Sequence, residues 1–441
     1  KVVVKDFEHF QDHRSLFNDK ESLLARNLVS LKGEEWKEMR SSLSPAFTSS
    51  KIRLMVPFMV EVGDQMTANL KEKIKSSGAD YIDIESKDLT SRYANDVIAT
   101  CAFGLKVDSQ VEENNQFLKM GKDFTNMSIR KVLTIVLSIV MPKLVDFFKM
   151  DILSKDANKF FRSLVLGTMK DRERNNIIRH DMIHLLMEAK KGHLTHDNIK
   201  SNEDNTGFAA VEESLIETKT VNREWTDTDL IAQAVIFFIA GFETVSTAMT
   251  FLLYELARNP EVQEKLVQEI QEQNAKNNGN IDFKSIEQMQ YLDMVVSESL
   301  RIWPPGVGLE RVCTKDYNLG RPNDKASKDF VVRKDTTLTI PVIAFHRDPQ
   351  YFENPDKFDP ERFSEENKHK INTNAYMPFG IGPRNCIASR FALCEVKVLV
   401  YQLLQHFEVS PCEKTCIPPV LDMNAANMAL KGGHWLKLKI R

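Results

Sequence analysis

The sequence predicts a mainly α-helical protein with a small β region, folded as a single domain over residues 1–441. Apolar residues recur at helical spacing in four long segments, near 56–75, 89–103, 230–257 and 390–407. Valine, threonine and isoleucine cluster between turn residues at 311–319 and 330–342, which predicts a few strands. Hydrophobic residues make up 42% of the 441 residues, which is enough to build a large core.

Charge and cysteine content narrow the functional class. Lys plus Arg total 59 against 62 for Asp plus Glu, so no global positive field favours a nucleic-acid partner. The six cysteines form no CxxC pair and no even framework of the kind that small secreted domains use. We therefore predict a protein of a reducing compartment that does not bind nucleic acid.

Two segments stand apart from the helical pattern. Residues 193–229 are polar and irregular, which predicts a surface loop between two helical regions. The run from Val132 to Met141 is apolar for roughly ten residues, about half of what a bilayer span needs. A pocket roof or a contact with a membrane surface suits this run better than a spanning helix.

A glycine-rich loop carries the strongest chemical signal. It reads Phe379-Gly-Ile-Gly-Pro-Arg-Asn-Cys386 and leads into the helix near 390–407. A helix N-terminus stabilises a thiolate, glycines let the backbone approach a flat ligand, and Arg384 can reach an anionic group. One alternative is that Cys386 is a small buried apolar residue. Structural zinc is another, but the spacing to the nearest other candidates does not fit it; these are Cys394, His369 and His406.

The helix near 230–257 is apolar on almost every face, and Glu243 near its middle is the exception. An unpaired carboxylate is costly in an apolar setting and commonly marks function. Ala240 lies four residues before Thr244, so a small residue and a hydroxyl share one face, where a cavity has room to open. The alternative is that Thr244 bonds back to a helix carbonyl and Glu243 is solvated.

These two segments resemble motifs of the cytochrome P-450 family. Phe379 to Cys386, continuing to Ala392, is similar to the family's haem-binding loop, and Ala240 to Thr244 to its oxygen-binding motif. The resemblance implies the family's fold, with haem b held through Cys386 as the iron ligand. It also implies that Thr244 orients dioxygen and Glu243 feeds protons. Ala388 and Val245 depart from the usual Gly and second hydroxyl.

Further positions match the family one by one. Glu298, Arg301 and Arg362 correspond to a buried network behind the haem, although a Glu and an Arg three apart on a helix usually form a surface pair. Positions matching those that serve the haem propionates are held by Trp36, Arg40, Arg311 and Arg384. Without the family, Trp36 and Arg40 are only neighbours on an amphipathic helix.

The resemblance implies a monooxygenase that puts one oxygen atom of O2 into a small apolar substrate, with electrons from NADPH through a flavoprotein reductase. We hypothesise that Lys37 and Lys397 help to dock an acidic reductase. By resemblance, the substrate pocket is lined near Leu23–Val29, Val132–Phe148, Phe237–Thr244, Val307–Leu309 and Asn424–Met428.

The resemblance is strongest to microsomal detoxifying members of the family in animals. The sequence from Leu309 to Cys313 suggests the insect branch. Ser389 before Arg390 favours the endoplasmic reticulum membrane, at its cytoplasmic face, over the mitochondrion. The family's N-terminal anchor helix, hinge and first strands are expected to be missing from the chain. Membrane association is expected through that anchor and through Val132 to Phe148.

Three alternatives remain open. A haem-thiolate isomerase would need no external electrons, and the Glu243–Thr244 pair argues against it. A non-enzymatic haem or hydrophobe-binding protein would show no turnover. An incomplete chain would hold little haem. Two histidine pairs have the four-residue spacing of a metal face but lack a catalytic Glu, so we assign them to surface or core packing; they are His9 with His13 and His180 with His184.

Overall fold

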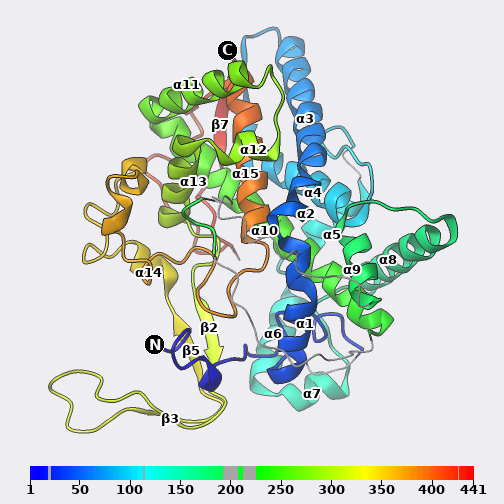
Figure 1. The fold of residues 1–441 in the computed structure, drawn as a ribbon, viewed down its shortest axis with the longest axis vertical. Helices are drawn as coiled ribbons and strands as arrows, with labels where there is room; N and C mark the ends of the chain where they lie inside the picture. The colour runs from blue at the N-terminus through cyan, green and yellow to red at the C-terminus, as the bar shows by residue number, and fades with distance from the viewer. Residues whose placement is uncertain (18–20, 113–114, 192–206, 212–224, 426) are drawn as a thin grey trace.

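The computed structural model describes residues 1–17, 21–112, 115–191, 207–211, 225–425 and 427–441. Helix dominates this part of the chain, and Figure 1 shows the long helices gathered around α10, with the β2–β5 ladder at one edge. The longest helices are α3 (Val56–Ser77), α4 (Ser86–Phe103), α8 (Lys155–Asn175), α10 (Asp227–Arg258), α11 (Pro260–Lys276) and α15 (Ser389–His406). The shorter helices are α1 (Gly33–Leu43), α2 (Ser49–Arg53), α5 (Gln116–Thr125), α6 (Ile129–Val140), α7 (Pro142–Phe147), α9 (Met182–Lys190), α12 (Phe283–Glu287), α13 (Gln290–Ile302) and α14 (Val342–His346).

Helix α10 forms the centre of the fold. Its first turn is fixed by a capping box, in which the side chains of Thr226 and Asp229 each accept from the other's backbone N–H. Beyond this turn it packs along α4 and α15. Among the described helices, α10 alone is long and apolar enough to cross a membrane, yet 61% of its most apolar window is buried inside the protein. The helix is therefore placed as a core element, as its all-round apolar character predicts.

The predicted strands are present but shorter and more broken than expected. The 311–319 segment divides into β2 (Leu309–Val312) and β3 (Tyr317–Asn318), and 330–342 into β4 (Val331–Val332) and β5 (Thr337–Ile340). Strand β2 pairs antiparallel with β5, and β3 with β4. Pro341, which has no N–H to donate, ends β5, and residues from Val342 onward turn into α14 instead of continuing the strand.

The structure also contains a three-stranded sheet that the sequence does not predict. Its order is β1–β7–β6, from β1 (Tyr81–Glu85), β6 (Phe407–Ser410) and β7 (Trp435–Ile440), all antiparallel. Its strands come from distant parts of the chain, and two of them directly adjoin long helices, α4 after β1 and α15 before β6. Short strands at helix ends carry little periodicity of their own, so the helical signal obscured them.

The prediction of a polar surface loop over residues 193–229 is correct only in part. Residues 192–206 and 212–224 lie outside the described residues. Between them, however, Phe208 is not a surface side chain: its ring contacts Phe363 at 5.1 Å and Tyr376 at 5.5 Å, and its N–H donates to Asp293 at 2.8 Å. Asp227 already begins α10. A loop prediction from polarity misses an anchoring aromatic residue, because one side chain leaves no periodic signal.

Candidate functional site

A cavity of about 510 Å³ separates α10 from the cysteine loop. Cys386 lines it on the loop side, and Ala240 and Thr244 line it on the helix side. All three side chains are open to the cavity. The lining is mostly apolar, and it includes Trp36, Ile98, Phe237, Val245, Ala248, Leu309, Phe379 and Leu393. A volume between 300 and 1,000 Å³ with few polar groups is usual for a cofactor or drug-sized ligand.

The cysteine loop is shaped by its glycines. Gly380 and Gly382 have φ of 76° and 79°, which side chains rarely tolerate, and a Cβ on Gly382 would lie 1.9 Å from the carbonyl oxygen of Val3. The loop closes through the Cys386 N–H, which donates to the Phe379 carbonyl at 2.8 Å. Glycine is therefore needed at both positions to present the sulfur to the cavity.

Cys386 lies three residues before α15, so the prediction that it sits at the helix N-terminus is wrong in detail. Burial raises the pKa of its thiol, against the backbone hydrogen bond of Ala388 and the positive charge of Arg40, which both lower it. Although the sulfur is accessible from the cavity, it lies deep beneath the protein surface. Local donors alone therefore do not favour the thiolate here.

Arg311 is the clearest unsatisfied group of the site. Its side chain is 1% exposed, Nη1 donates to the Glu310 carbonyl at 2.7 Å, and Nε and Nη2 have no hydrogen-bond partner. Burial lowers its pKa to about 10, because the charged form is desolvated. Leaving buried charged donors unpaired is costly, so this residue is suited to an anionic ligand.

Two further arginines line the same cavity as Arg311. Arg40 donates to the backbone and side-chain oxygens of Asn385 at 2.8 and 2.7 Å. Burial lowers the pKa of Arg384 to about 9; Asp12 opposes this shift, while the charges of Arg311 and Arg40 add to it. His13 is predicted as surface or core packing, but it lines the cavity here, where burial and the charges of Arg384 and Arg311 lower its pKa to about 3. This self-repelling group fits a ligand that carries carboxylates.

Arg384 supplies charge more than free donors. Its Nε and Nη2 donate to the carbonyls of Gln11 at 2.8 Å and Leu31 at 2.7 Å, and its guanidinium lies 4.0 Å from the centre of the Trp36 ring. Trp36 itself is 1% exposed and lines the cavity from α1. The structure thus brings all four predicted residues to the cavity: Arg40, Arg311 and Arg384 contribute positive charge, and Trp36 forms part of the wall.

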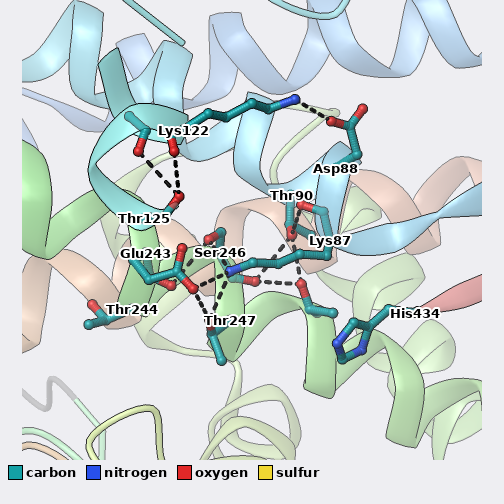
Figure 2. A network of polar contacts seen from close by, with 12 residues as sticks. Lys87, Asp88, Thr90, Lys122, Thr125, Glu243, Thr244, Ser246, Thr247 and His434 are labelled. Carbon is teal, nitrogen blue, oxygen red and sulfur yellow. Dashed lines mark hydrogen bonds and ion pairs between the residues drawn. The ribbon is translucent and has the colours of Figure 1, made fainter. Parts of the chain in front are cut away.

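On the face of α10 that lines the cavity, the small side chain of Ala240 and the hydroxyl of Thr244 lie one helical turn apart. The Thr244 hydroxyl donates to the Ala240 carbonyl at 2.6 Å, which is the back-bonded alternative. Glu243, on the neighbouring face, is only partly solvated: its side chain is 19% exposed, and its carboxylate pairs with Lys87 of α4 at 3.0 Å. Figure 2 shows Glu243 reaching Lys87 and Thr244 lying apart from this network. Lys87 was missed because its partner lies 156 residues away.

Behind the cavity, Glu298, Arg301 and Arg362 form a buried network. Arg301 donates to Glu298 from Nε at 2.7 Å and from Nη2 at 2.8 Å, and both side chains are 0% exposed. Arg362, in the 3₁₀ turn η3 (Pro360–Phe363), reaches the same carboxylate at 3.3 Å, and the Asp359 N–H donates to it at 2.8 Å. The surface-pair alternative is therefore wrong for Glu298 and Arg301.

Parts of the predicted pocket are correct and parts are not. Cavity residues come from three of the five predicted segments, through Leu28, Val29, Phe237, Ala240, Gly241, Thr244, Gly308 and Leu309. No described residue of 132–148 or 424–428 lines this cavity. Among the described residues, no group of three His, Cys, Asp or Glu side chains gathers as a metal site, so nothing there supports zinc.

The docking hypothesis for Lys397 is wrong. Its side chain is 3% exposed and its Nζ lies 2.8 Å from Asp293, so it offers no surface charge. Lys37 stays at the surface, 30% exposed and paired with Glu34 at 2.7 Å. Helix α15 is buried along almost its whole length, and Lys397 is buried with it. A lysine within an apolar pattern is ordinarily expected at the surface, so the sequence does not indicate this burial.

The comparisons with known proteins agree with this geometry. A family model described as cytochrome P450 matches residues 1–216 and 211–434. The chain is 43% identical to cytochrome P450 9e2 of Blattella germanica, over 100% of the chain and 81% of that protein. It is 39% identical to probable cytochrome P450 9f2 of Drosophila melanogaster, over 99% and 82%, and 36% identical to cytochrome P450 6k1 of Blattella germanica, over 98% and 79%. This chain belongs to the cytochrome P450 family, whose members are haem-thiolate monooxygenases.

Proposed function

We propose that the chain holds haem b through Cys386 and oxidises small lipophilic molecules with one oxygen atom from O2, using electrons from NADPH that a flavoprotein reductase delivers. One observation carries the proposal: the Cys386 sulfur opens into a cavity of about 510 Å³ whose opposite wall carries Ala240 and Thr244. The unpaired donors of Arg311 support a cofactor with carboxylates, as haem has.

Each residue has a stated task. Haem supplies the oxygen-activating chemistry when bound. Cys386 would supply the sulfur ligand, Arg311, Arg40 and Arg384 would neutralise the propionates, and Trp36 and Phe379 would wall the cofactor. Thr244 would orient oxygen and water on the helix side, Ala240 would leave room for them, and Glu243 would supply protons. The network of Glu298, Arg301 and Arg362 holds α13 and the η3 turn together behind the haem.

The substrate class follows from the lining. Most of the cavity wall is apolar, with side chains such as Ile98, Phe237 and Leu309; the polar lining residues are His13, Arg40, Thr244, Glu310, Arg311, Arg384, Asn385 and Cys386. Such a wall binds molecules by burying apolar surface and leaves little for a charged substrate to bond with. Xenobiotics and endogenous lipids or hormones share this character, so we propose a broad lipophilic class.

The proposal is tested with purified protein. The reduced, carbon-monoxide-bound form should show the red-shifted Soret band of thiolate ligation, and apolar compounds should shift the spectrum of the oxidised form. With NADPH and a flavoprotein reductase, mass spectrometry should find products that gain one oxygen atom. Turnover without NADPH would favour the isomerase, and ligand binding without any product would favour a binding protein.

Replacement of Arg311 by methionine should have opposite effects on the haem-free and haem-bound protein. Without haem, removing a desolvated charge with two unpaired nitrogens should leave stability unchanged or raised. With haem, the loss of charge-assisted hydrogen bonds, worth about 1.5–3 kcal/mol, should weaken haem retention by roughly 10- to 100-fold. Haem transfer to apomyoglobin measures retention, and thermal unfolding measures stability. Equal haem retention in both proteins would contradict the role of Arg311.

We also propose that α6 and α7 contact the endoplasmic reticulum membrane from its cytoplasmic side. Helix α6 is inverted for a helix in water: it buries Lys131, Thr134 and Ser138. Its exposed apolar side chains, with those of and next to α7, include Ile129 (88%), Leu133 (53%), Val140 (70%), Phe147 (80%) and Phe148 (63%). A large exposed apolar patch marks a binding surface, and exposed Lys143 and Lys149 beside it suit anionic lipid. In Figure 1 both helices lie at one end of the molecule.

Changing Leu133, Val140 and Phe147 to serine should weaken membrane binding while leaving the fold intact, because these side chains are already exposed. Flotation of the purified chain with phosphatidylcholine–phosphatidylserine vesicles measures the effect, and we expect a loss of at least about tenfold, since full burial of even one such side chain contributes about 1.5–3 kcal/mol. A triple change of exposed Val4, Val111 and Ile178 is the control, since these residues lie outside α6 and α7. Equal flotation of all three proteins would contradict the proposal.

A further inference from the structure

Lys87, the second residue of α4, donates hydrogen bonds to three side chains on one face of α10. Its Nζ lies 3.0 Å from Glu243 Oε1, 2.8 Å from Ser246 Oγ and 2.8 Å from Thr247 Oγ1. An ammonium group has three N–H donors and no acceptor, so these contacts use its full capacity. Figure 2 shows the lysine extended across to α10 with Glu243, Ser246 and Thr247 converging on it.

These hydrogen bonds hold the Glu243 carboxylate on the face of α10 that meets α4. Glu243, Ser246 and Thr247 are spaced i, i+3 and i+4, so they form one face of the helix. The cavity is lined by another face, through Ala240, Thr244 and Ala248. Because consecutive residues are about 100° apart around a helix, Glu243 can turn toward α4 while Thr244 faces the cavity. Thr247 Oγ1 donates to Glu243 at 3.3 Å and strengthens this orientation.

The pair sits at the border between core and solvent. The side chains of Lys87 and Glu243 are 26% and 19% exposed, so water reaches them, whereas Ser246 and Thr247 are 0% and 4% exposed. Burial lowers the pKa of Lys87, and Glu243 and Glu85 oppose that shift. His434 also faces the lysine; burial and the charge of Lys87 lower its pKa to about 4, so it is neutral near pH 7. The charged neighbours of Lys87 are thus both carboxylates.

We propose that Lys87 is a positioning residue for proton delivery: its ion pair and hydrogen bonds hold the Glu243 carboxylate in one orientation at the point where solvent protons enter, one residue from Thr244. The inference rests on the proposed function and extends it to a residue on another helix. A carboxylate held in one orientation can take up a proton from water and pass it on, whereas a carboxylate that turns freely is correctly placed only part of the time. Lys87 does not line the cavity, so its proposed effect on the reaction passes through Glu243.

Three variants separate charge from shape. Lys87→Met removes the charge and keeps the length, Lys87→Arg keeps the charge, and Glu243→Gln removes the group through which Lys87 acts. The control is Lys122→Met, because Lys122 on α5 pairs with Asp88 of α4 at 2.9 Å and does not reach Glu243. All are compared as haem-bound protein with a flavoprotein reductase, NADPH and an alkoxycoumarin as the probe substrate.

Lys87→Met should lower product formed per NADPH by roughly tenfold, raise the hydrogen peroxide released, and increase the solvent deuterium isotope effect, because proton delivery slows. Lys87→Arg should keep most of the wild-type values, and Lys122→Met all of them. In the Glu243→Gln background, adding Lys87→Met should change nothing further, since residues that act through one another are not additive.

A readout independent of turnover completes the test. In infrared difference spectra between wild-type and variant haem-bound proteins, Lys87→Met should shift a carboxylate stretching band that Glu243→Gln removes, because the position of the band depends on the hydrogen bonds that the carboxylate accepts. An unshifted band in Lys87→Met, additive effects in the double variant, or an arginine variant as impaired as methionine would overturn the proposal. If the wild-type protein lacked thiolate ligation or NADPH-dependent turnover, the proposed function itself would fail, and the infrared band would still report on the pair.

Discussion

Cys386→Ser should abolish thiolate ligation and with it the oxidation reaction. Serine keeps the size of the side chain and the loop that presents it, but its oxygen does not donate electron density to iron as a thiolate does. Loss of even an outer-shell partner typically costs a metal site 10- to 100-fold in affinity or activity, so loss of the ligand itself should cost at least about 100-fold. The carbon monoxide spectrum of the reduced protein and the rate of product formation measure both effects.

Cys394→Ser provides the matched control. Cys394 is also buried, at 5% exposed, and lies on α15 eight residues later, but it does not line the cavity. Burial raises the pKa of its thiol to about 12, so it stays protonated. This variant should keep both the spectrum and the activity. Wild-type oxidation in Cys386→Ser would show that the sulfur at 386 is not the ligand.

Glu298→Ala should destabilise the protein by about 3–5 kcal/mol, because it strands buried guanidinium groups without a counter-charge. Arg301 is 0% exposed and Arg362 is 14% exposed, so water cannot fully replace the carboxylate. The loss should spread, because Arg301 also donates to the His346 carbonyl at 2.8 Å and His346 Nε2 accepts from the Met377 N–H at 2.9 Å, just ahead of the cysteine loop. We expect poor haem retention together with a lower unfolding temperature.

An exposed ion pair shows how much burial matters. Lys265 and Glu361 pair at 2.5 Å with side chains 55% and 50% exposed, so Lys265→Ala should cost no more than about 1 kcal/mol. Unfolding of both variants is followed at one fixed heating rate, since a large haem protein can unfold irreversibly. Similar unfolding temperatures for Glu298→Ala and Lys265→Ala would contradict the central role of the network.

The long helices could be predicted from the sequence, and the reason is periodicity. Helix α3 was expected near 56–75 and spans Val56–Ser77, and α10 was expected near 230–257 and spans Asp227–Arg258. Each helix buries a continuous stripe or its whole surface. The apolar residues that form the buried surface therefore recur every three or four positions in the sequence. The sheet of β1, β7 and β6 has no such signal, because its pairing joins Tyr81 to Lys439 across most of the chain.

The candidate site divides in the same way. Cys386, Gly380 and Arg384 stand in one short loop, so their spacing carried the haem hypothesis. The errors concern burial: Lys397 seemed free and is enclosed, and residues 132–148 seemed to line the pocket and instead expose an apolar face. Burial depends on which elements meet, and a sequence window records only what a residue is.

By itself, the sequence determined the helical class, the loop that carries Cys386 and the family resemblance, because these depend on residues close together in the chain. Only the tertiary structure decided that Lys87 meets Glu243, that Arg311 keeps unpaired donors inside the cavity, and that Glu298 and Arg301 form a buried pair instead of a surface pair. The physical reason is that hydrogen bonds and charge pairs act over a few ångströms in space. Chain folding brings such partners together from positions 60 to 160 residues apart, as for Arg362 with Glu298 and Lys87 with Glu243.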